Sequence, residues 1–245
     1  MMNILGVRLD DLTFPQAVEK GVRLLQDPNP SMLFFLNLDC LYRADSDKEY
    51  KAYLNGASLV LPDGIGLKGA ARLCGERVKD NCNGTDYCPA LMAEAAKKGC
   101  RIYLLGGRPG VADEAAANIV KQIPALKVVG THAGYFEPDE NVIEAINRSE
   151  ADILLVAMGV PLQEKWIGRN RAALKPRLCI GVGALFDFWS GRVPRAPLWM
   201  RRCKIEWVWR TFVEPKRLGQ RYLFDLLFLW KILCLRLTGC DIKRG

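Results

Sequence analysis

The segment LVLPDGIGLKG, residues 59–69, places an acidic side chain where an apolar run ends. The run from Ala57 to Leu61 is typical of a buried strand, and a proline stops it. Asp63 comes next, and its neighbours Ile65 and Leu67 are expected to limit its hydration. A carboxylate held partly out of water has a raised pKa, which suits a general base. Alternatively, this aspartate caps the helix that follows the strand.

Two other polar segments carry similar alternatives. Gln163 and Glu164 begin a helix within GVPLQEKWIGRNR. They either cap a surface helix that has Trp166 in the core, or hydrogen-bond to the edge of a sugar or uracil. Asn83 and Thr85 lie in the polar turn DNCNGTD, which is either a simple helix entry or a ligand contact.

The elements that must position these residues alternate along the chain. Apolar runs predict strands at 32–37, 57–62, 101–107, 151–159 and 177–183, and a strand followed by a loop at 126–136. Helical periodicity with glycine stops predicts helices at 41–56, 65–75, 87–99, 110–123, 139–149 and 162–174. Continuous apolar strands between helices indicate a Rossmann-like α/β fold, with a mostly parallel sheet and helices on both faces.

Ligands of such sheets bind outside the carboxyl ends of the strands. Most of the turns expected there contain glycine, which lets backbone N–H groups approach a ligand, and each following helix offers its positive end. We therefore expect a phosphate-bearing ligand, the alternative being that the glycines only form tight turns. The candidate binding residues are Asn37, Asp39, Gly64, Asn83, Thr85, Asp86, Gly106, Gly107, Gly159, Pro161, Gln163, Glu164 and Gly183.

Several kinds of site are disfavoured by spacing. The nine cysteines form no C-x-x-C pair and only one histidine, His132, is present, so zinc-ligand spacing is absent. His132 follows a strand and is either structural or catalytic. GGRPGVAD at 106–113 lacks the G-x-G-x-x-G order of a dinucleotide site. The acids of DSD at 45–47 fall on a predicted helix face, so we expect no divalent metal and no cofactor.

The charge is concentrated at the C-terminal end. The net charge is +8. Residues 192–245 hold 13 Lys/Arg and 4 Asp/Glu, a balance of +9, and four of the six tryptophans. We expect a globular domain at 1–191 and a helical appendage at 192–245, with Pro215 separating two helices. Aromatic, leucine and basic residues over 198–237 predict a helix lying at a membrane surface, the alternatives being a core helix or a dimer contact. The aliphatic density of 226–235 argues against nucleic acid.

The combination of motifs resembles the WecG/TagA/CpsF family of bacterial glycosyltransferases. The matching segments are FLNLDCLYRA, ADSDKEYKAYLNGASLVLPDGIGL, NGTDYCPALM, IYLLGGRPGVAD, VGTHAGYF, ADILLVAMGVPLQEKWI and GVGALFDFWSGRVPRAPLWMRRCKIEWVWRTFVEPKRL. They cover almost the whole chain. PDGIG, GxPxQEKW and GVGxxFDFxxGxxxRAPxWM are specific only in combination.

The resemblance implies an inverting, metal-independent transfer of a sugar from a UDP-sugar to a sugar on polyprenyl diphosphate, at the inner face of the cytoplasmic membrane. The donor sugar implied is N-acetylmannosamine or a relative such as its uronic acid. The catalytic base implied is Asp63, with Asn37, Gln163 and Glu164 around the donor. The products that fit this reaction are an exopolysaccharide, the linkage unit of a teichoic acid, or a similar surface glycan.

Two positions depart from the family pattern. Phe35 stands where a threonine is common, and Asn81 stands where an arginine is common and would help to balance diphosphate charge. Tail arginines are candidates to supply that charge or to bind the acceptor, namely Arg192, Arg195, Arg201 and Arg202. Rival functions are transfer of another sugar such as glucose, a nucleotide-cofactor oxidoreductase, and an inactive scaffold of a glycan-synthesis complex. A homo-oligomer is left open.

Overall fold

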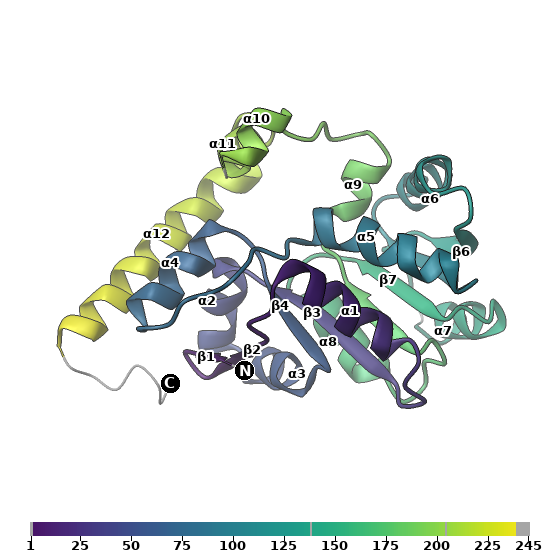
Figure 1. Cartoon of the computed structure of the whole chain (residues 1–245), viewed down its shortest axis with the longest axis horizontal. Helices are drawn as coiled ribbons and strands as arrows, with labels where there is room; N and C mark the ends of the chain where they lie inside the picture. The colour runs from purple at the N-terminus through teal and green to yellow at the C-terminus, as the bar shows by residue number, and fades with distance from the viewer. Residues whose placement is uncertain (1, 138, 204, 239–245) are drawn as a thin grey trace.

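The computed structural model describes residues 2–137, 139–203 and 205–238, without the side chains of residues 202, 216, 217 and 220. Its main sheet has six strands in the order β4-β3-β8-β7-β5-β6, and every neighbouring pair is parallel. The expected α/β fold is therefore confirmed (Figure 1). The strands are β3 (Ser31–Leu36), β4 (Leu59–Pro62), β5 (Arg101–Gly106), β6 (Lys127–His132), β7 (Ile153–Ala157) and β8 (Leu178–Gly181).

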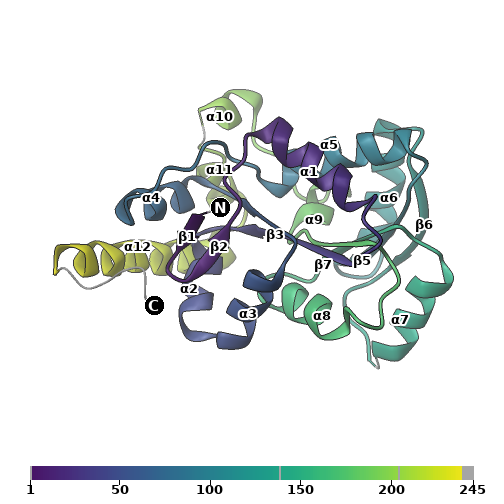
Figure 2. The same cartoon turned by 60° about the horizontal axis from the view of Figure 1, so that its bottom comes forward.

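Helices cover both faces of this sheet, as Figure 2 shows. Side chains alternate between the faces, so Leu33 and Phe35 enter one core layer while Phe34 and Leu36 enter the other. One layer is closed by α1 (Phe14–Leu24), α5 (Gly84–Lys97), α6 (Val111–Gln122) and α9 (Leu185–Trp189). The other is closed by α2 (Leu38–Ser46), α3 (Lys48–Gly56), α4 (Ile65–Leu73), α7 (Asp139–Arg148), α8 (Leu162–Asn170) and α12 (Pro215–Leu237).

Residues 41–56 were expected to form one helix, and this was wrong. Two helices meet at Asp47. This residue has an extended backbone conformation, and it is both the C-terminal cap of α2 and the N-terminal cap of α3. Its side chain accepts a hydrogen bond from the N–H of Tyr50 at 3.0 Å and pairs with Lys165 of α8. A good capping residue therefore interrupts a continuous helical pattern.

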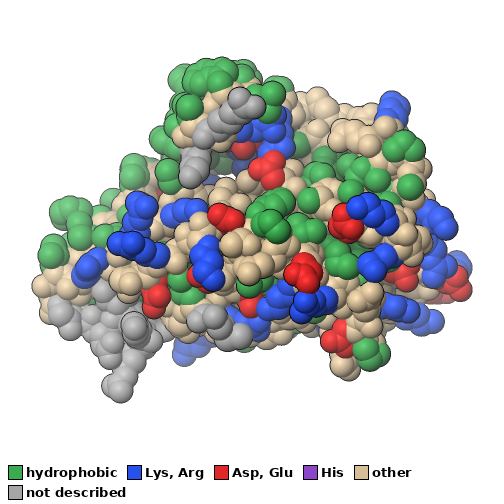
Figure 3. All heavy atoms as spheres, viewed as in Figure 1, with side chains coloured by type: hydrophobic (Ala, Val, Ile, Leu, Met, Phe, Trp, Pro, Cys, Tyr) green, Lys and Arg blue, Asp and Glu red, His purple; other side chains and the backbone are tan. Residues whose placement is uncertain are grey.

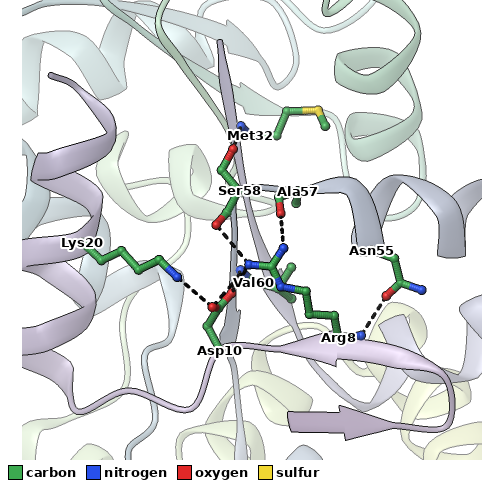
Figure 4. A network of polar contacts seen from close by, with 8 residues as sticks. All are labelled: Arg8, Asp10, Lys20, Met32, Asn55, Ala57, Ser58 and Val60. Atoms are coloured by element: carbon green, nitrogen blue, oxygen red, sulfur yellow. Dashed lines mark hydrogen bonds and ion pairs between the residues drawn. The ribbon is translucent and has the colours of Figure 1, made fainter. Parts of the chain in front are cut away.

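The N-terminal segment, not anticipated as structure, forms the antiparallel hairpin of β1 (Met2–Ile4) and β2 (Val7–Leu9). Asp10 follows it, is buried, and accepts hydrogen bonds from Lys20 at 2.8 Å and from the N–H of Val60 at 3.0 Å. Arg8 approaches the same carboxylate at 3.1 Å and also donates to the carbonyl of Ala57 (Figure 4). This network attaches the hairpin and α1 to the edge strand β4.

The C-terminal appendage consists of three helices. These are α10 (Leu198–Arg202), α11 (Glu206–Val213) and α12, and Pro215 begins α12 as expected. The boundary expected between residues 191 and 192 falls in the segment that joins α9 to α10. Helix α12 lies along α2 and α4 at one end of the molecule (Figure 1). In the part of the chain that the structure describes, no helix is both long enough and apolar enough to cross a bilayer.

Asp10→Asn should lower the free energy of unfolding by about 3 kcal/mol at neutral pH, because it leaves two cations beside a buried neutral group. Burial alone would raise the pKa of Asp10, but Lys20, the N–H of Val60 and Arg8 hold it below its ordinary 3.8. The contribution is therefore present at neutral pH and is lost as pH falls through the lowered pKa. Denaturant unfolding at pH 7 and pH 3 measures both effects.

The control for this substitution is Glu19→Gln. Glu19 forms an exposed pair with Arg23 in α1, so its loss should change stability by less than about 1 kcal/mol. Equal effects of the two substitutions at pH 7 would contradict the proposed role of Asp10.

Candidate active site

The carboxyl ends of the parallel strands bring Asn37 and Asp63 together. The N–H of Asp63 donates to the carbonyl of Leu36 at 2.8 Å, which continues the β3–β4 pairing one residue past the end of β4. The side chain of Asn37 hydrogen-bonds to Asp63 while its own Oδ1 accepts from the N–H of Cys40 at 3.0 Å. The amide of Asn37 therefore serves both as the cap of α2 and as a partner of the acid.

The structure decides against a capping role for Asp63. The residue that caps α4 is Gly64, and no side chain caps that helix. Gly64 has φ of +88°, a conformation that favours glycine, and a Cβ there would meet no atom within 4 Å. Its N–H donates to Oδ1 of Asn81 at 2.7 Å, so the neighbouring loop fixes the turn. The carboxylate of Asp63 is therefore not used to cap α4.

Burial raises the pKa of Asp63, which is the direction and the cause expected from limited hydration. Of the two apolar neighbours, Leu67 is buried and Ile65 is more than half exposed. The charges that oppose the raised pKa are the guanidinium groups of Arg210 in α11 and Arg221 in α12. The appendage therefore contributes to the surroundings of the acid, and its helices supply cations to the site.

Arg221 and Arg210 are site residues that the sequence interpretation missed. Arg221 lies 3.7 Å from the carboxylate of Asp39, which is buried and also accepts a hydrogen bond from Arg43 at 3.1 Å. Arg210 lies over the ring of Phe188, 5.3 Å from its centre. A usable signal existed for Arg221, because it shares the helical spacing of the buried residues of α12. Those residues are Leu218, Phe228 and Ile232.

Gln163 and Glu164 are buried at the start of α8, and neither caps it. Nε2 of Gln163 donates to Oε1 of Glu164 at 2.7 Å, and Oε1 of Gln163 accepts from the N–H of Gly183 at 2.9 Å. One amide thus connects the turns after β7 and β8. Oε2 of Glu164 is buried without a hydrogen-bond partner, and burial raises the pKa of this acid to about 7. Trp166 is in the core, as expected.

The remaining strand ends extend the site away from Asp63. Gly106 and Gly107 end β5, which is separated from β4 by β3, β8 and β7. Four strand spacings of about 4.8 Å place the β5 turn about 19 Å from Asp63 along the same edge. Gly159 and Pro161 follow β7, so they lie between Asp63 and the β5 turn along this edge. His132 ends β6, the outermost strand, and its Nδ1 lies 2.7 Å from the carbonyl of Ala133.

The polar turn before α5 is a helix entry. Oδ1 of Asn83 accepts from Thr85 Oγ1 at 2.6 Å and from the N–H of Asp86 at 2.9 Å, so Asn83 caps the helix. Arg195 reaches this turn from the segment before α10, donating to Thr85 at 2.9 Å and to Asp86 at 2.6 Å. Thr85 and Asp86 are therefore occupied by a tail arginine.

The structure describes the side chains of two of the three other tail arginines, which were expected to bind the diphosphate or the acceptor. Arg192 forms a double hydrogen bond with Glu114 of α6, at 2.7 and 2.8 Å. Arg201 in α10 has a buried Nε without a hydrogen-bond partner, and the side chain of Arg202 lies outside the described part of the chain. The acids of the DSD segment form ion pairs, Asp45 with Lys231 and Asp47 with Lys165.

Comparison with known proteins identifies the family of this chain. Residues 2–240 match the model of the glycosyl transferase WecG/TagA/CpsF family. This chain belongs to that family. Relatives named N-acetylglucosaminyldiphosphoundecaprenol N-acetyl-beta-D-mannosaminyltransferase occur in Bacillus subtilis (35% identical, covering 74% of this chain and 71% of the relative) and in Bacillus spizizenii (31%, covering 72% and 68%). One from Staphylococcus aureus is 27% identical and covers 94% and 91%.

Both departures from the family pattern have a structural role in this glycosyltransferase. Phe35 is buried on the α5 face of the sheet, where its ring lies edge-on to that of Tyr87 with the centres 5.7 Å apart, and a Cβ on Gly84 would come within 3.3 Å of it. Asn81 holds the Gly64 turn. Family membership also leaves the oxidoreductase alternative without support.

Glu164→Gln should remove a pH dependence of stability. Because the pKa of Glu164 is raised to about 7 from 4.5, the folded state binds an extra proton between those values. Stability from this group is complete below pH 4.5 and is lost as pH rises through 7. The wild-type protein should therefore lose up to about 3 kcal/mol relative to the variant between pH 5 and pH 8.

Unfolding by urea at several pH values measures this difference. Glu144→Gln, which changes an exposed acid of α7, is the control and should show no such trend. A wild-type-to-variant difference that stays constant from pH 5 to pH 8 would mean that Glu164 ionises normally in the folded protein.

Proposed function

We propose that this glycosyltransferase moves N-acetylmannosamine, or a related hexose, from its UDP conjugate to a sugar on polyprenyl diphosphate, in the synthesis of a bacterial surface polysaccharide or teichoic acid. The name shared by the relatives supports the donor sugar and the lipid-linked acceptor. The structural observation that carries the proposal is the position of Asp63 directly after the carboxyl end of β4. This acid is half-buried and has a raised pKa.

The length of the site supports an extended donor. Asp63 and Asn37 lie at one end of the strand edge and the Gly106–Gly107 turn at the other. A nucleotide diphosphate sugar that runs along this edge has its sugar beside Asp63 and its base toward β5. Helix N-termini and backbone N–H groups between these ends suit a diphosphate.

The proposed reaction is a single inverting displacement. The acceptor hydroxyl oxygen attacks the anomeric carbon, Asp63 takes the hydroxyl proton, and the bond to UDP breaks with its electron pair leaving on the diphosphate. Cations stabilise that developing charge when they are already positioned. The arginines of the appendage, above all Arg210 and Arg221 near Asp63, fit this role without a metal ion.

Asp63→Asn should lower kcat about a hundredfold to ten-thousandfold, because the amide cannot accept the proton. The KM for the UDP-sugar should change little. The measurement is release of UDP in the presence of a polyprenyl-diphosphate sugar, with Asp27→Asn, in the turn after α1, as the control. In the wild-type protein, kcat should fall toward acid pH with a midpoint above the ordinary aspartate value of 3.8.

Two outcomes would count against this mechanism. Full turnover by Asp63→Asn would remove the acid from the chemistry. A wild-type protein that binds UDP-sugar but releases no UDP with any acceptor would favour the inactive-scaffold alternative.

We further propose that the appendage attaches the enzyme to the inner face of the cytoplasmic membrane. The outer face of α12 exposes leucine and tryptophan side chains at helical spacing, and α10 and α11 expose others beside it (Figure 3). The inner face of α12 is held to the body by Lys231–Asp45 and by hydrogen bonds from Arg236 to the carbonyls of Arg72 and Leu73. The large apolar residues exposed on these helices are Leu198, Trp199, Trp207, Phe212, Val213, Leu223, Phe224, Leu226, Leu227, Trp230 and Leu237.

Replacing Leu226 and Trp230 together with serine should weaken binding to anionic vesicles at least tenfold. Burying such side chains is worth roughly 1.5–3 kcal/mol each, and 1.4 kcal/mol is a factor of ten. Co-flotation with vesicles measures the change. Tyr135→Ser, which removes an exposed aromatic ring from the body, is the control. Unchanged flotation of the double variant would disprove insertion by α12.

A further inference from the structure

A basic cavity beside α4 is not used by the site described so far. It has a volume of about 720 Å³ and is lined by Lys68 and Arg72 of α4 and by the segment that follows the helix. Arg77 and Lys79 come from that segment, and Glu76 is the one acid in the lining. The lining therefore carries a net charge of +3 at neutral pH, which suits an anion.

The two segments that line this cavity, α4 and the segment after it, are both connected to the turn that holds Asp63. Helix α4 begins two residues after the acid, and Lys68 and Arg72 follow one turn apart on the same face. The eight residues from Ile65 to Arg72 are separated by seven helical steps of about 1.5 Å, a length of about 10 Å. The return segment ends at Asn81, which binds the N–H of Gly64, and the N–H of Cys82 donates to the carbonyl of Pro62 at 2.8 Å.

The other side of α4 faces the appendage. Leu229 of α12 lies 4.0 Å from the position that a Cβ on Gly69 would take, and Arg236 donates to the backbone carbonyl of Arg72 at 3.0 Å. Figure 3 shows Lys and Arg side chains close to apolar ones on the surface formed by α4 and α12. The helix that forms one wall of the cavity therefore also contacts the appendage.

We propose that this cavity binds the diphosphate of the lipid-linked acceptor. This inference rests on the proposed function and adds the place of the second substrate. One hexose between the cavity and Asp63 presents its hydroxyl to the acid, while the polyprenyl chain leaves along α12 into the membrane. Guanidinium groups suit this ligand because they bind phosphate oxygens in pairs.

A second cavity shows why position matters as much as charge. Arg148 and Lys175 contribute to a cavity of about 520 Å³ that also carries a net positive lining. It includes Arg101, the first residue of β5, so it lies at the amino ends of the strands, opposite Asp63. Its cations provide a matched control for those of the α4 cavity.

The test compares Arg72→Gln/Arg77→Gln with Arg148→Gln/Lys175→Gln in the full-length protein. The first probe is farnesyl diphosphate, whose binding is followed by calorimetry. The first variant should bind it at least tenfold more weakly, since a hydrogen bond to a charged group is worth about one order of magnitude in affinity. The control should bind as the wild type does. The contact from Arg236 reaches a backbone carbonyl, so both arginines can be changed without removing it.

Kinetic measurements give the second readout. With a polyprenyl-diphosphate sugar, Arg72→Gln/Arg77→Gln should raise the acceptor KM about tenfold while the donor KM stays within twofold. An alkyl glycoside of the same sugar, which lacks diphosphate, should be used equally well by variant and wild type.

Each contrary result has a distinct meaning. The proposal would be overturned if the wild-type protein did not bind farnesyl diphosphate, or if both variants lost the same affinity for it. So would loss of binding to phosphatidylglycerol vesicles with farnesyl diphosphate binding unchanged, because that assigns the cavity to lipid headgroups. If no sugar transfer occurs but farnesyl diphosphate binds through Arg72 and Arg77, the proposed function fails and the diphosphate site stands.

Discussion

One backbone hydrogen bond, from the N–H of Asp63 to the carbonyl of Leu36, sets the geometry on which the site depends. It joins Leu36, the last residue of β3, to the first residue after β4 and so extends the pairing of these strands. Asn37 and Asp63 consequently leave the sheet side by side. The surrounding turn is then fixed by Asn81 through the N–H of Gly64, so an acid that costs free energy to bury keeps a defined position.

The appendage completes this site as well as covering part of the body. A cation in the buried stripe of a helix is unfavourable unless it is paired, and Arg221 meets Asp39 there. The same guanidinium, together with that of Arg210, acts on Asp63. The two faces of α12 therefore have different tasks, since its inner side brings charge to the site while its outer side exposes leucine and tryptophan.

The centre of the strand edge is organised by a buried amide. Gln163 uses its oxygen for the N–H of Gly183 and its nitrogen for Glu164. A backbone N–H that the glycine pattern offered to a ligand is thus already engaged by the protein. Buried polar groups of this kind specify geometry because every alternative arrangement leaves one of them unsatisfied.

The sequence by itself determined the alternation of strands and helices, the place of Asp63 at a strand end, and the apolar, basic character of the appendage. These features are local, because an apolar run, a proline and a helical spacing are all written within a few residues. Only the tertiary structure decided that Gly64 rather than Asp63 caps α4, that Asp47 divides one helical pattern into two, and that Arg210 and Arg221 lie near the acid. Asn81 holds the turn at Gly64, Lys165 of α8 pairs with Asp47, and the place of Arg210 and Arg221 depends on how α12 packs against α2 and α4. Such contacts between separate segments are set by the packing of whole elements, which no local spacing records.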